Sequence, residues 1–457
     1  MTAQSKNANS ITQGTIWKSM LMYFSTLLLG AFFQQLYNTV DAVIVGRAVG
    51  SEGLAAVGGS AAMVVNLFVG FFIGLSSGAT VVIAQFYGAD RKSEVEKAVH
   101  TSLAIAMIGG AIITVIGLLT ASWIIDIMNT PKEVIEASTA YLRVYFLGMI
   151  ANLVYNVGAG ILRAVGDSKR PLYVLVISCF VNIFLDVFFV IILGLGKIGV
   201  KEGVIGACIA TVLCQIISAV IVMVMLIRSN DSYQVKLSQI GVDSDMLKRI
   251  ISIGFPAGVQ STMYTLSNMI IQSAINEFGK NATAAWAAYG KIDVLFWMTI
   301  SSLGTAVTTF AGQNYGAGKY SRVRGTARQA FVIAFIITVP LSLILLMWGK
   351  GLLYVFVEDT AVIEIGVQMI NFLAPFYLTY VAVEILSGAL RGMGSALMPM
   401  LITLSGICIL RVVWILAVFP FNKTIETVET SYPITWITTS ILFIIYYIYY
   451  VKKHNIR

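Results

Sequence analysis

The chain has 457 residues, of which 58% are hydrophobic and only 11% are charged, and its formal net charge is +8. Soluble domains carry about a quarter charged residues, so this composition excludes a soluble protein and indicates that most of the surface faces lipid. The positive charge does not indicate nucleic-acid binding, because lysines and arginines lie in short runs between apolar stretches, for example Lys169-Arg170 and Lys452-Lys453.

Twelve apolar stretches follow one another along the chain, and each is long enough to cross a membrane, which takes about 20 residues. The first six lie near residues 16–46, 53–84, 101–125, 134–160, 172–194 and 203–227. The second six lie near residues 250–276, 282–310, 329–349, 365–388, 399–420 and 433–451. The sequence therefore predicts an all-α membrane protein with twelve transmembrane helices.

The positions of the basic residues predict the orientation. With the N-terminus in the cytoplasm, most lysines and arginines fall in cytoplasmic loops, as the positive-inside rule requires. Both termini are then cytoplasmic, and the polar segment 229–249 links an N-terminal lobe (1–228) to a C-terminal lobe (250–457). No cleavable signal is visible, because the first apolar stretch is too long for one. We expect a monomeric, multi-pass protein of the inner (plasma) membrane, surrounded by the lipid bilayer.

Helices one and five each carry an acidic residue at membrane depth. Asp41 has Asn38 three positions before it, and Asp186 has Asn182 four positions before it, so each acid shares a helix face with an amide. A charge in the bilayer costs about 3 kcal/mol or more, so one that is retained indicates a function. We expect these four residues to bind H⁺ or Na⁺. The alternative is that Asp41 ends helix one at the interface and that Asp186 is a structural hydrogen-bond partner.

The turns after helices two and eight repeat one pattern. The first runs from Gln85 through Gly88 to Ala89 and the second from Gln313 through Gly316 to Ala317, and both read Gln-x-Tyr-Gly-Ala. Equivalent residues in the two copies are separated by a constant number of positions, which is the separation of Gln85 and Gln313. This separation is called the offset of the repeat. Glycine lets the chain turn tightly just outside the membrane.

The turns after helices four and ten repeat a second pattern at the same offset. Arg163 and Gly166 belong to the first copy of Leu-Arg-x-x-Gly, and Arg391 and Gly394 belong to the second. An even number of helices per copy gives both halves the same orientation, so we expect a parallel repeat of two pseudo-symmetric six-helix lobes.

The charges inside the second half differ from those of the first. At the offset of the repeat, Asp41 and Asp186 correspond to Met269 and Trp414, which are apolar, so the cation chemistry is expected in the first lobe alone. Asp293 in helix eight either binds a cationic substrate or pairs with Lys291 or Arg411. Helix ten carries Glu384, near its cytoplasmic end.

Two arginines lie near the middle of membrane helices. A bundle does not leave a buried charge unpaired, so Arg143 in helix four and Arg411 in helix eleven are each expected to face an internal carboxylate or a water-filled cavity.

Several polar residues at membrane depth are candidates to line a substrate cavity. Aromatic faces attract organic cations, and methionine suits promiscuous surfaces. The candidates are Gln34, Tyr37, Asn66, Asn152, Tyr155, Asn156, Gln260 and Asp293.

The repeated turns, the pair Asn182-x-x-x-Asp186 and the twelve-helix length resemble the multidrug and toxic compound extrusion (MATE) transporters. The resemblance covers essentially the whole chain. It implies a V-shaped pair of six-helix lobes that exports amphipathic, often cationic drugs in exchange for H⁺ or Na⁺, and it points to the same acidic positions in the first lobe. Some relatives carry a sodium site in the second lobe. The acids of that site lie in helices seven and ten, whereas here Glu277 lies at the outer end of helix seven and Glu384 lies nearer the cytoplasmic end of helix ten. This departure weakens a second-lobe sodium site and favours H⁺ over Na⁺.

The sequence therefore predicts a secondary active multidrug exporter that works by alternating access. A lipid-linked saccharide flippase of related architecture is the alternative, kept open by Arg143 and Arg411. A passive channel is disfavoured. With two histidines, His100 and His454, and no phosphate-binding loop, nucleophile motif or metal cluster, we expect no enzyme activity, metal site or cofactor, and no nucleic-acid partner.

Overall fold

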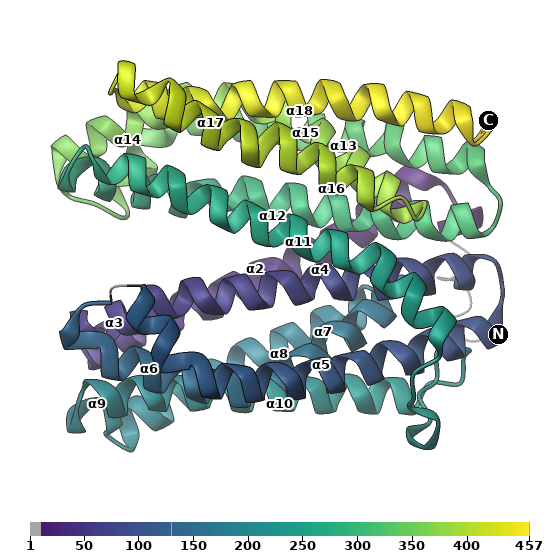
Figure 1. Cartoon of the computed structure of the whole chain (residues 1–457), viewed down its shortest axis with the longest axis horizontal. Coiled ribbons are helices and arrows are strands. Elements are labelled where there is room, and N and C mark those ends of the chain that lie inside the picture. Colours follow the sequence, from purple (N-terminus) through teal and green to yellow (C-terminus); the bar gives the residue numbers. More distant parts are fainter. Residues whose placement is uncertain (1–10, 129, 457) are drawn as a thin grey trace. The chain divides into compact units, whose positions relative to one another are not determined.

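The computed structural model describes residues 11–128 and 130–456, and every regular element in that part of the chain is a helix (Figure 1). Residues 1–10, which the sequence assigns to the N-terminal lobe and to the cytoplasm, lie outside the described residues. The first half contains α2 (Ile16–Ala48), α3 (Ser51–Gly58), α4 (Ser60–Gly88), α5 (Lys92–Ile127), α6 (Lys132–Leu147), α7 (Met149–Ala164), α8 (Lys169–Asp186), the π-helix η1 (Val187–Ile192), α9 (Leu195–Ile198) and α10 (Val200–Ile227).

The short 3₁₀ helix η2 (Leu237–Gln239) lies between the halves. The second half contains α11 (Ser244–Asn276), α12 (Lys280–Gly316), α13 (Tyr320–Tyr354), α14 (Thr360–Leu373), the 3₁₀ helix η3 (Ala374–Phe376), α15 (Tyr377–Gly392), α16 (Leu397–Thr403), the π-helix η4 (Leu404–Ile409), α17 (Leu410–Ala417), the 3₁₀ helix η5 (Phe419–Phe421) and α18 (Ile425–Lys453).

The helix count of the described residues agrees with the twelve predicted helices. Ten segments are long and apolar enough to cross a membrane, and the bent pair α6–α7 makes eleven. The twelfth is α11, which has 33 residues but carries many polar side chains. Ile112, Val115 and Leu119 form an exposed apolar stripe on α5, which fits a surface that faces lipid.

Several predicted helices are broken. The second is split at Gly59, and the fourth bends by 51° at Gly148, between α6 and α7. Pro375 lies in η3 and divides the tenth, because proline cannot donate the next helical hydrogen bond. By contrast, α13 runs through Pro340 without a break.

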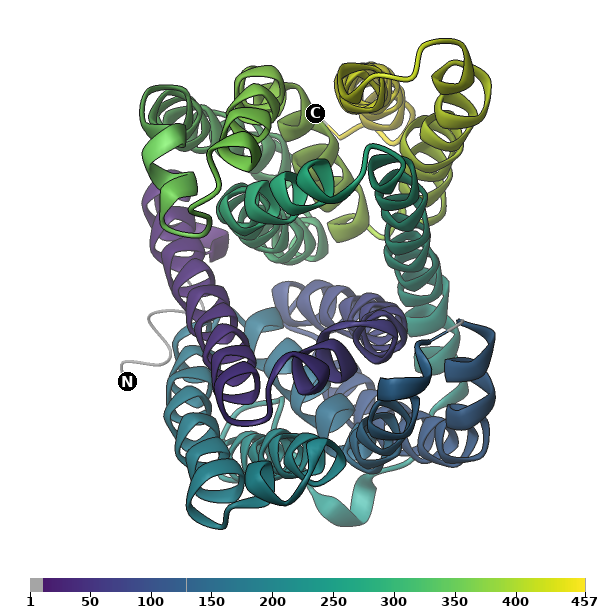
Figure 2. The same cartoon turned by 90° about the vertical axis from the view of Figure 1, so that its left-hand side faces the viewer.

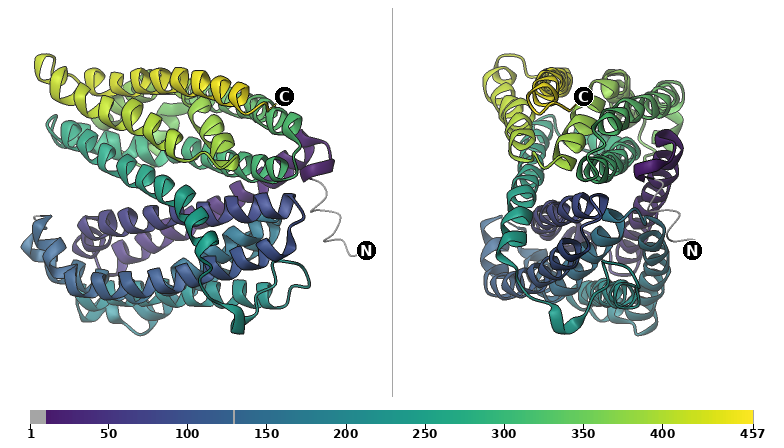
Figure 3. Two further views of the ribbon diagram at one scale, coloured as in Figure 1. Left: turned by 45° about the vertical axis from the view of Figure 1, so that its right-hand side comes forward. Right: turned by 90° about the vertical axis from the view of Figure 1, so that its right-hand side faces the viewer.

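The chain forms two compact units. One is Ser25–Phe255, and the other consists of residues 11–24 with residues 256–456. Viewed along their axes, the helices of each unit form a bundle (Figure 2). The boundaries fall inside α2 and inside α11, and Figure 3 shows α11 in teal as one long helix. The first unit below means Ser25–Phe255, and the second unit means the other.

The predicted repeat extends to single hydrogen bonds. Gly166 and Gly394 have φ angles of 93° and 90°, which favour glycine. The amide of Gly166 donates to the carbonyl oxygen of Arg163 at 3.0 Å, and that of Gly394 donates to Arg391 at 2.8 Å. In the other pair of turns, Asp90 and Gly318 occupy equivalent positions, with φ angles of 56° and 68°.

Helix packing repeats as well. A Cβ atom on Gly160 of α7 would lie 2.7 Å from Thr80 Oγ1 of α4. At the equivalent positions of the second copy, a Cβ atom on Gly388 of α15 would lie 3.1 Å from Thr308 Oγ1 of α12. Small residues thus let the backbones of both helix pairs approach closely.

Candidate functional site

The first unit places Asp186 at a break in helix geometry. Asp186 is the last residue of α8, and the π-helix η1 begins at the next residue. Single π-turns are rare and often occur at functional sites. Asn182 lies one turn earlier on the same face, and both side chains are fully buried, at 0% exposure.

Asp41 of α2 completes this group. It is partly buried, and its charge acts on Asp186, so the two carboxyl groups lie within electrostatic range of each other. All four predicted cation-site residues lie in the first unit, and three of them, Asp41, Asn182 and Asp186, are buried or partly buried. Asn38 lies on α2 one turn before Asp41, but it is exposed.

The polar atoms of this group lack hydrogen-bond partners. Among the described residues none bonds to Asp41 Oδ1, to either carboxyl oxygen of Asp186, or to the side-chain amide of Asn182. Buried polar atoms are nearly always paired, because an unpaired one costs about 1–3 kcal/mol. A site of acidic oxygens without donors is chemically suited to a proton or a small cation.

Side chains from α6 and α10 surround the acids. Tyr141 and Cys208 lie within electrostatic range of Asp41, and the Cys208 thiol donates to the Tyr141 carbonyl oxygen at 3.3 Å. Cys214 of α10 lies within electrostatic range of Asp186. The sequence did not single out these residues, because their types are common in membrane helices and only the fold brings α6 and α10 to α2 and α8.

The predicted cavity residues are divided between the units. Gln34, Tyr37, Asn66, Asn152, Tyr155 and Asn156 belong to the first unit, whereas Gln260 and Asp293 belong to the second. Gln34 and Asn66 are exposed. Gln260 is held by its Nε2, which donates to Thr403 Oγ1 at 3.1 Å. That the eight residues line one cavity stays a prediction.

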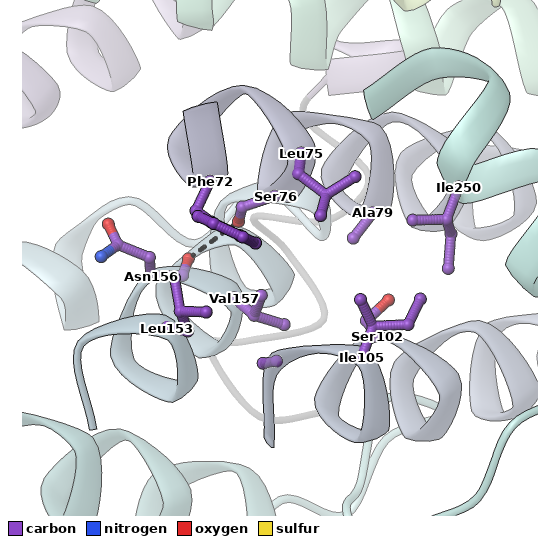
Figure 4. Close-up of a pocket in the computed structure, with 11 residues that line it drawn as sticks. Phe72, Leu75, Ser76, Ala79, Ser102, Ile105, Leu153, Asn156, Val157 and Ile250 are labelled. Atoms are coloured by element: carbon purple, nitrogen blue, oxygen red, sulfur yellow. Dashed lines mark hydrogen bonds between the residues drawn. The ribbon is translucent and has the colours of Figure 1, made fainter. Parts of the chain in front are cut away.

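A small cavity lies inside the first unit, near two of these residues. It has a volume of about 20 Å³ and is lined mainly by apolar side chains, together with Ser76, Ser102 and Asn156 (Figure 4). The side-chain Nδ2 of Asn156 donates to the carbonyl oxygen of Asn152 at 2.8 Å. Because such a space holds about one water molecule, and drug-sized ligands need at least ~300 Å³, this cavity is not a drug site.

Asp293 does not pair with either predicted cation. Tyr377 donates to Oδ1 and Trp297 Nε1 donates to Oδ2, both at 2.6 Å. Tyr289 and Tyr377 are joined by a further hydrogen bond of 3.0 Å, and Lys291 is exposed. The predicted ion pairs with Lys291 and Arg411 are therefore wrong: aromatic donors satisfy this carboxylate. Glu384 lies 3.8 Å from the guanidinium of Arg391.

Neither mid-helix arginine has a carboxylate partner among the described residues. Arg143 is exposed, and it donates to Ser122 Oγ at 2.7 Å. The internal carboxylate is therefore wrong for Arg143, and the alternative of a water-filled cavity stays a prediction. Arg411 is only 3% exposed, and its neighbours are neutral.

The structure adds one buried acid that the sequence reasoning missed. Glu429 of α18 is 1% exposed, and its Oε1 has no partner among the described residues. The predicted twelfth helix began at residue 433, whereas α18 begins at Ile425 with a hydrogen bond from the Thr427 amide to Thr424 Oγ1. Recognition of this N-cap threonine would have placed Glu429 inside the helix.

Sequence comparisons agree with this arrangement. The sequence model of the MatE family matches residues 26–188 and 256–416, which make up most of the chain. The probable multidrug resistance protein YoeA of Bacillus subtilis is 29% identical over 447 residues, covering 97% of this chain and 96% of that protein. The probable multidrug resistance protein NorM of Thermotoga maritima is 27% identical over 332 residues, covering 72% and 70%.

Solved structures share the fold. A MOP superfamily transporter from Pyrococcus furiosus has a TM-score of 0.90 at 24% identity, covering 98% of both chains. A multidrug resistance MATE family transporter in an outward-facing conformation has a TM-score of 0.88 at 24% identity, covering 97% of this chain and 98% of that one. The predicted fold class, a twelve-helix bundle of the MATE type, is confirmed.

Proposed function

The chain belongs to the MatE family of multi-pass membrane transporters, and we propose that it exports amphipathic, often cationic molecules by antiport with protons. The names of the relatives in Bacillus subtilis and Thermotoga maritima support multidrug efflux. The observation that carries the coupling proposal is the unpartnered group of Asp41, Asn182 and Asp186 in the first unit.

The chemistry of this group favours a proton as the coupling ion. Two carboxyl groups within electrostatic range disfavour the doubly ionised state, so one of them readily holds a proton. In the second unit the equivalent positions hold Met269 and Trp414, which have no acidic oxygen to hold a proton or a sodium ion. In the proposed cycle, a proton entering this group displaces the cationic substrate, and its release on the cytoplasmic side resets the exporter.

Ethidium efflux tests the coupling site. Asp41→Asn and Asp186→Asn keep the size of each side chain but remove its titration, so we expect efflux driven by a pH gradient to fall about tenfold or more. Glu136→Gln is the matched control, since Glu136 is exposed and pairs with Lys201, and it should export normally.

Two results would count against the proposal. Normal efflux by both Asn variants at normal expression would remove the acids from the coupling mechanism. Efflux by the wild type that survives collapse of the proton gradient but stops without sodium would replace H⁺ by Na⁺.

A further inference from the structure

Arg411 occupies a distinctive place in the second unit. It is the second residue of α17, the helix that begins directly after the π-helix η4. At the offset of the repeat, Asn268 and Arg411 correspond to Val40 and Ile183, on the helix pair that carries Asp41 and Asp186 in the first unit. The same pair of helices in the repeat thus carries acids in one unit and an arginine in the other.

The contacts of Arg411 leave part of its guanidinium unsatisfied. One terminal nitrogen donates to Asn268 Oδ1 at 3.2 Å, the other donates to Thr435 Oγ1 at 3.4 Å, and the group lies 4.1 Å from the centre of the Tyr432 ring. Its Nε is buried and has no partner among the described residues.

Two further unpartnered groups of the second unit can also donate hydrogen bonds. The indole Nε1 of Trp436 and the hydroxyl of Ser267 are buried without partners among the described residues. Trp436 packs against Tyr432 with ring centres 5.5 Å apart, and Ser267 precedes Asn268 on α11. A guanidinium and an indole N–H can only donate, and a hydroxyl group can donate as well as accept, so this set suits an anionic oxygen.

Neither buried acid of the second unit, Asp293 or Glu429, supplies an anionic oxygen to Arg411. Asp293 is already held by Tyr377 and Trp297, and Glu429 makes no ion pair within the described part of the chain. Asn268 is exposed while Arg411 behind it is buried, so the guanidinium lies directly beneath a surface residue.

We propose that Arg411, together with Asn268, Thr435 and the indole of Trp436, binds the carboxylate group of transported molecules. The proposal rests on the proposed export function and extends its substrates from cations to zwitterions and acids. A guanidinium pairs with a carboxylate through two N–H···O bonds, and burial strengthens both. An incoming carboxylate would take the free Nε–H and replace the weak contact of 3.4 Å to Thr435.

Equilibrium dialysis of the purified full-length protein tests the site directly. The probes are norfloxacin and its methyl ester, which differ in the carboxylate, and we expect the wild type to prefer the acid. In Arg411→Gln the affinity for the acid should fall about thirtyfold, with the ester unchanged. In Asn268→Asp a carboxylate supplied by the protein occupies the guanidinium, and the same selective loss is expected although Arg411 is still present. Arg143→Gln, at the exposed mid-helix arginine, should bind like the wild type.

Three results would overturn the proposal. These are equal affinity of the wild type for acid and ester, equal loss of both probes in Arg411→Gln with an unchanged size-exclusion profile, and displacement of the acid by millimolar chloride. Ethidium efflux separates this outcome from the proposed function, because ethidium has no carboxylate. A wild type that does not export ethidium contradicts the export function and leaves the dialysis result valid.

Discussion

Backbone conformation explains which residues of the repeated turns are glycine. Gly166 and Gly394 adopt positive φ angles of 93° and 90°, where an L side chain is strained. The equivalent positions Asp90 and Gly318 also have positive φ, but smaller, at 56° and 68°, a region that aspartate tolerates better than most residues. Both halves therefore have glycine at the position where an L side chain would be most strained. They have different residues, Asp90 and Gly318, where the strain is smaller.

Gly166→Ala and Gly394→Ala should each lower the stability of the protein by about 1–2 kcal/mol, since alanine is strained at positive φ. The midpoint of thermal denaturation in detergent measures this. Gly290→Ala is the matched control, because Gly290 lies inside α12 with open space at its Cβ position. There the same change should raise the midpoint, as alanine favours a helix by about 1 kcal/mol over glycine. A lower midpoint for all three would contradict the conformational explanation.

Among the helices, α11 has a proline at the boundary between the two units. Pro256 is the first residue of the second unit and lies inside this helix. It removes one helical hydrogen bond and lets the helix bend there. The boundary in α2, after Phe24, has no proline.

Pro256→Ala should restore the missing hydrogen bond and stiffen α11, which raises the thermal midpoint and slows ethidium efflux by about twofold to tenfold if bending accompanies transport. Pro340→Ala in α13, entirely within the second unit, is the control: it should stabilise without slowing efflux. Equal efflux rates for the two variants would show that the bend at Pro256 is not used.

The sequence predicted the helices and the repeat well, because both depend on local signals. Apolar stretches and the constant offset between the repeated turns can be read without the fold. It also singled out Asp41 and Asp186, because acids are rare at membrane depth, and their role as a cation site stays a prediction. The sequence did not identify the partners of Asp293 and Arg143, because these partners are neutral: Tyr377 and Trp297 donate to Asp293, and Ser122 accepts from Arg143. Tyrosine, tryptophan and serine are common in this chain, so their residue types carry no signal of that role.

For the whole molecule, the division into units predicts how a cut chain behaves. Residues 11–24 belong with residues 256–456, whereas residues 25–255 form the first unit. Within the second unit, Arg322 donates to the carbonyl oxygens of Ile11 and Gly14, both at 2.8 Å, and Lys319 donates to that of Thr12 at 2.9 Å.

Fragments 1–240 and 241–457, expressed together with a tag on one of them, should therefore copurify. Each fragment carries a segment that belongs to the unit built mostly by the other, and the cut after Ile240 falls beside exposed residues. Removal of the residues before Ser25 should weaken the association, and Arg322→Ala should do so less. Failure of the intact pair to copurify would show that these segments contribute little to it.

The same exchange of segments sets an order of events during synthesis. Ile11, Thr12 and Gly14 leave the ribosome about 300 residues before their partners Lys319 and Arg322. At roughly 5–20 residues per second this interval lasts about 15–60 s. During that time the hydrogen bonds to Lys319 and Arg322 cannot form. Residues 11–14 therefore wait for these native contacts until the whole first unit has been made.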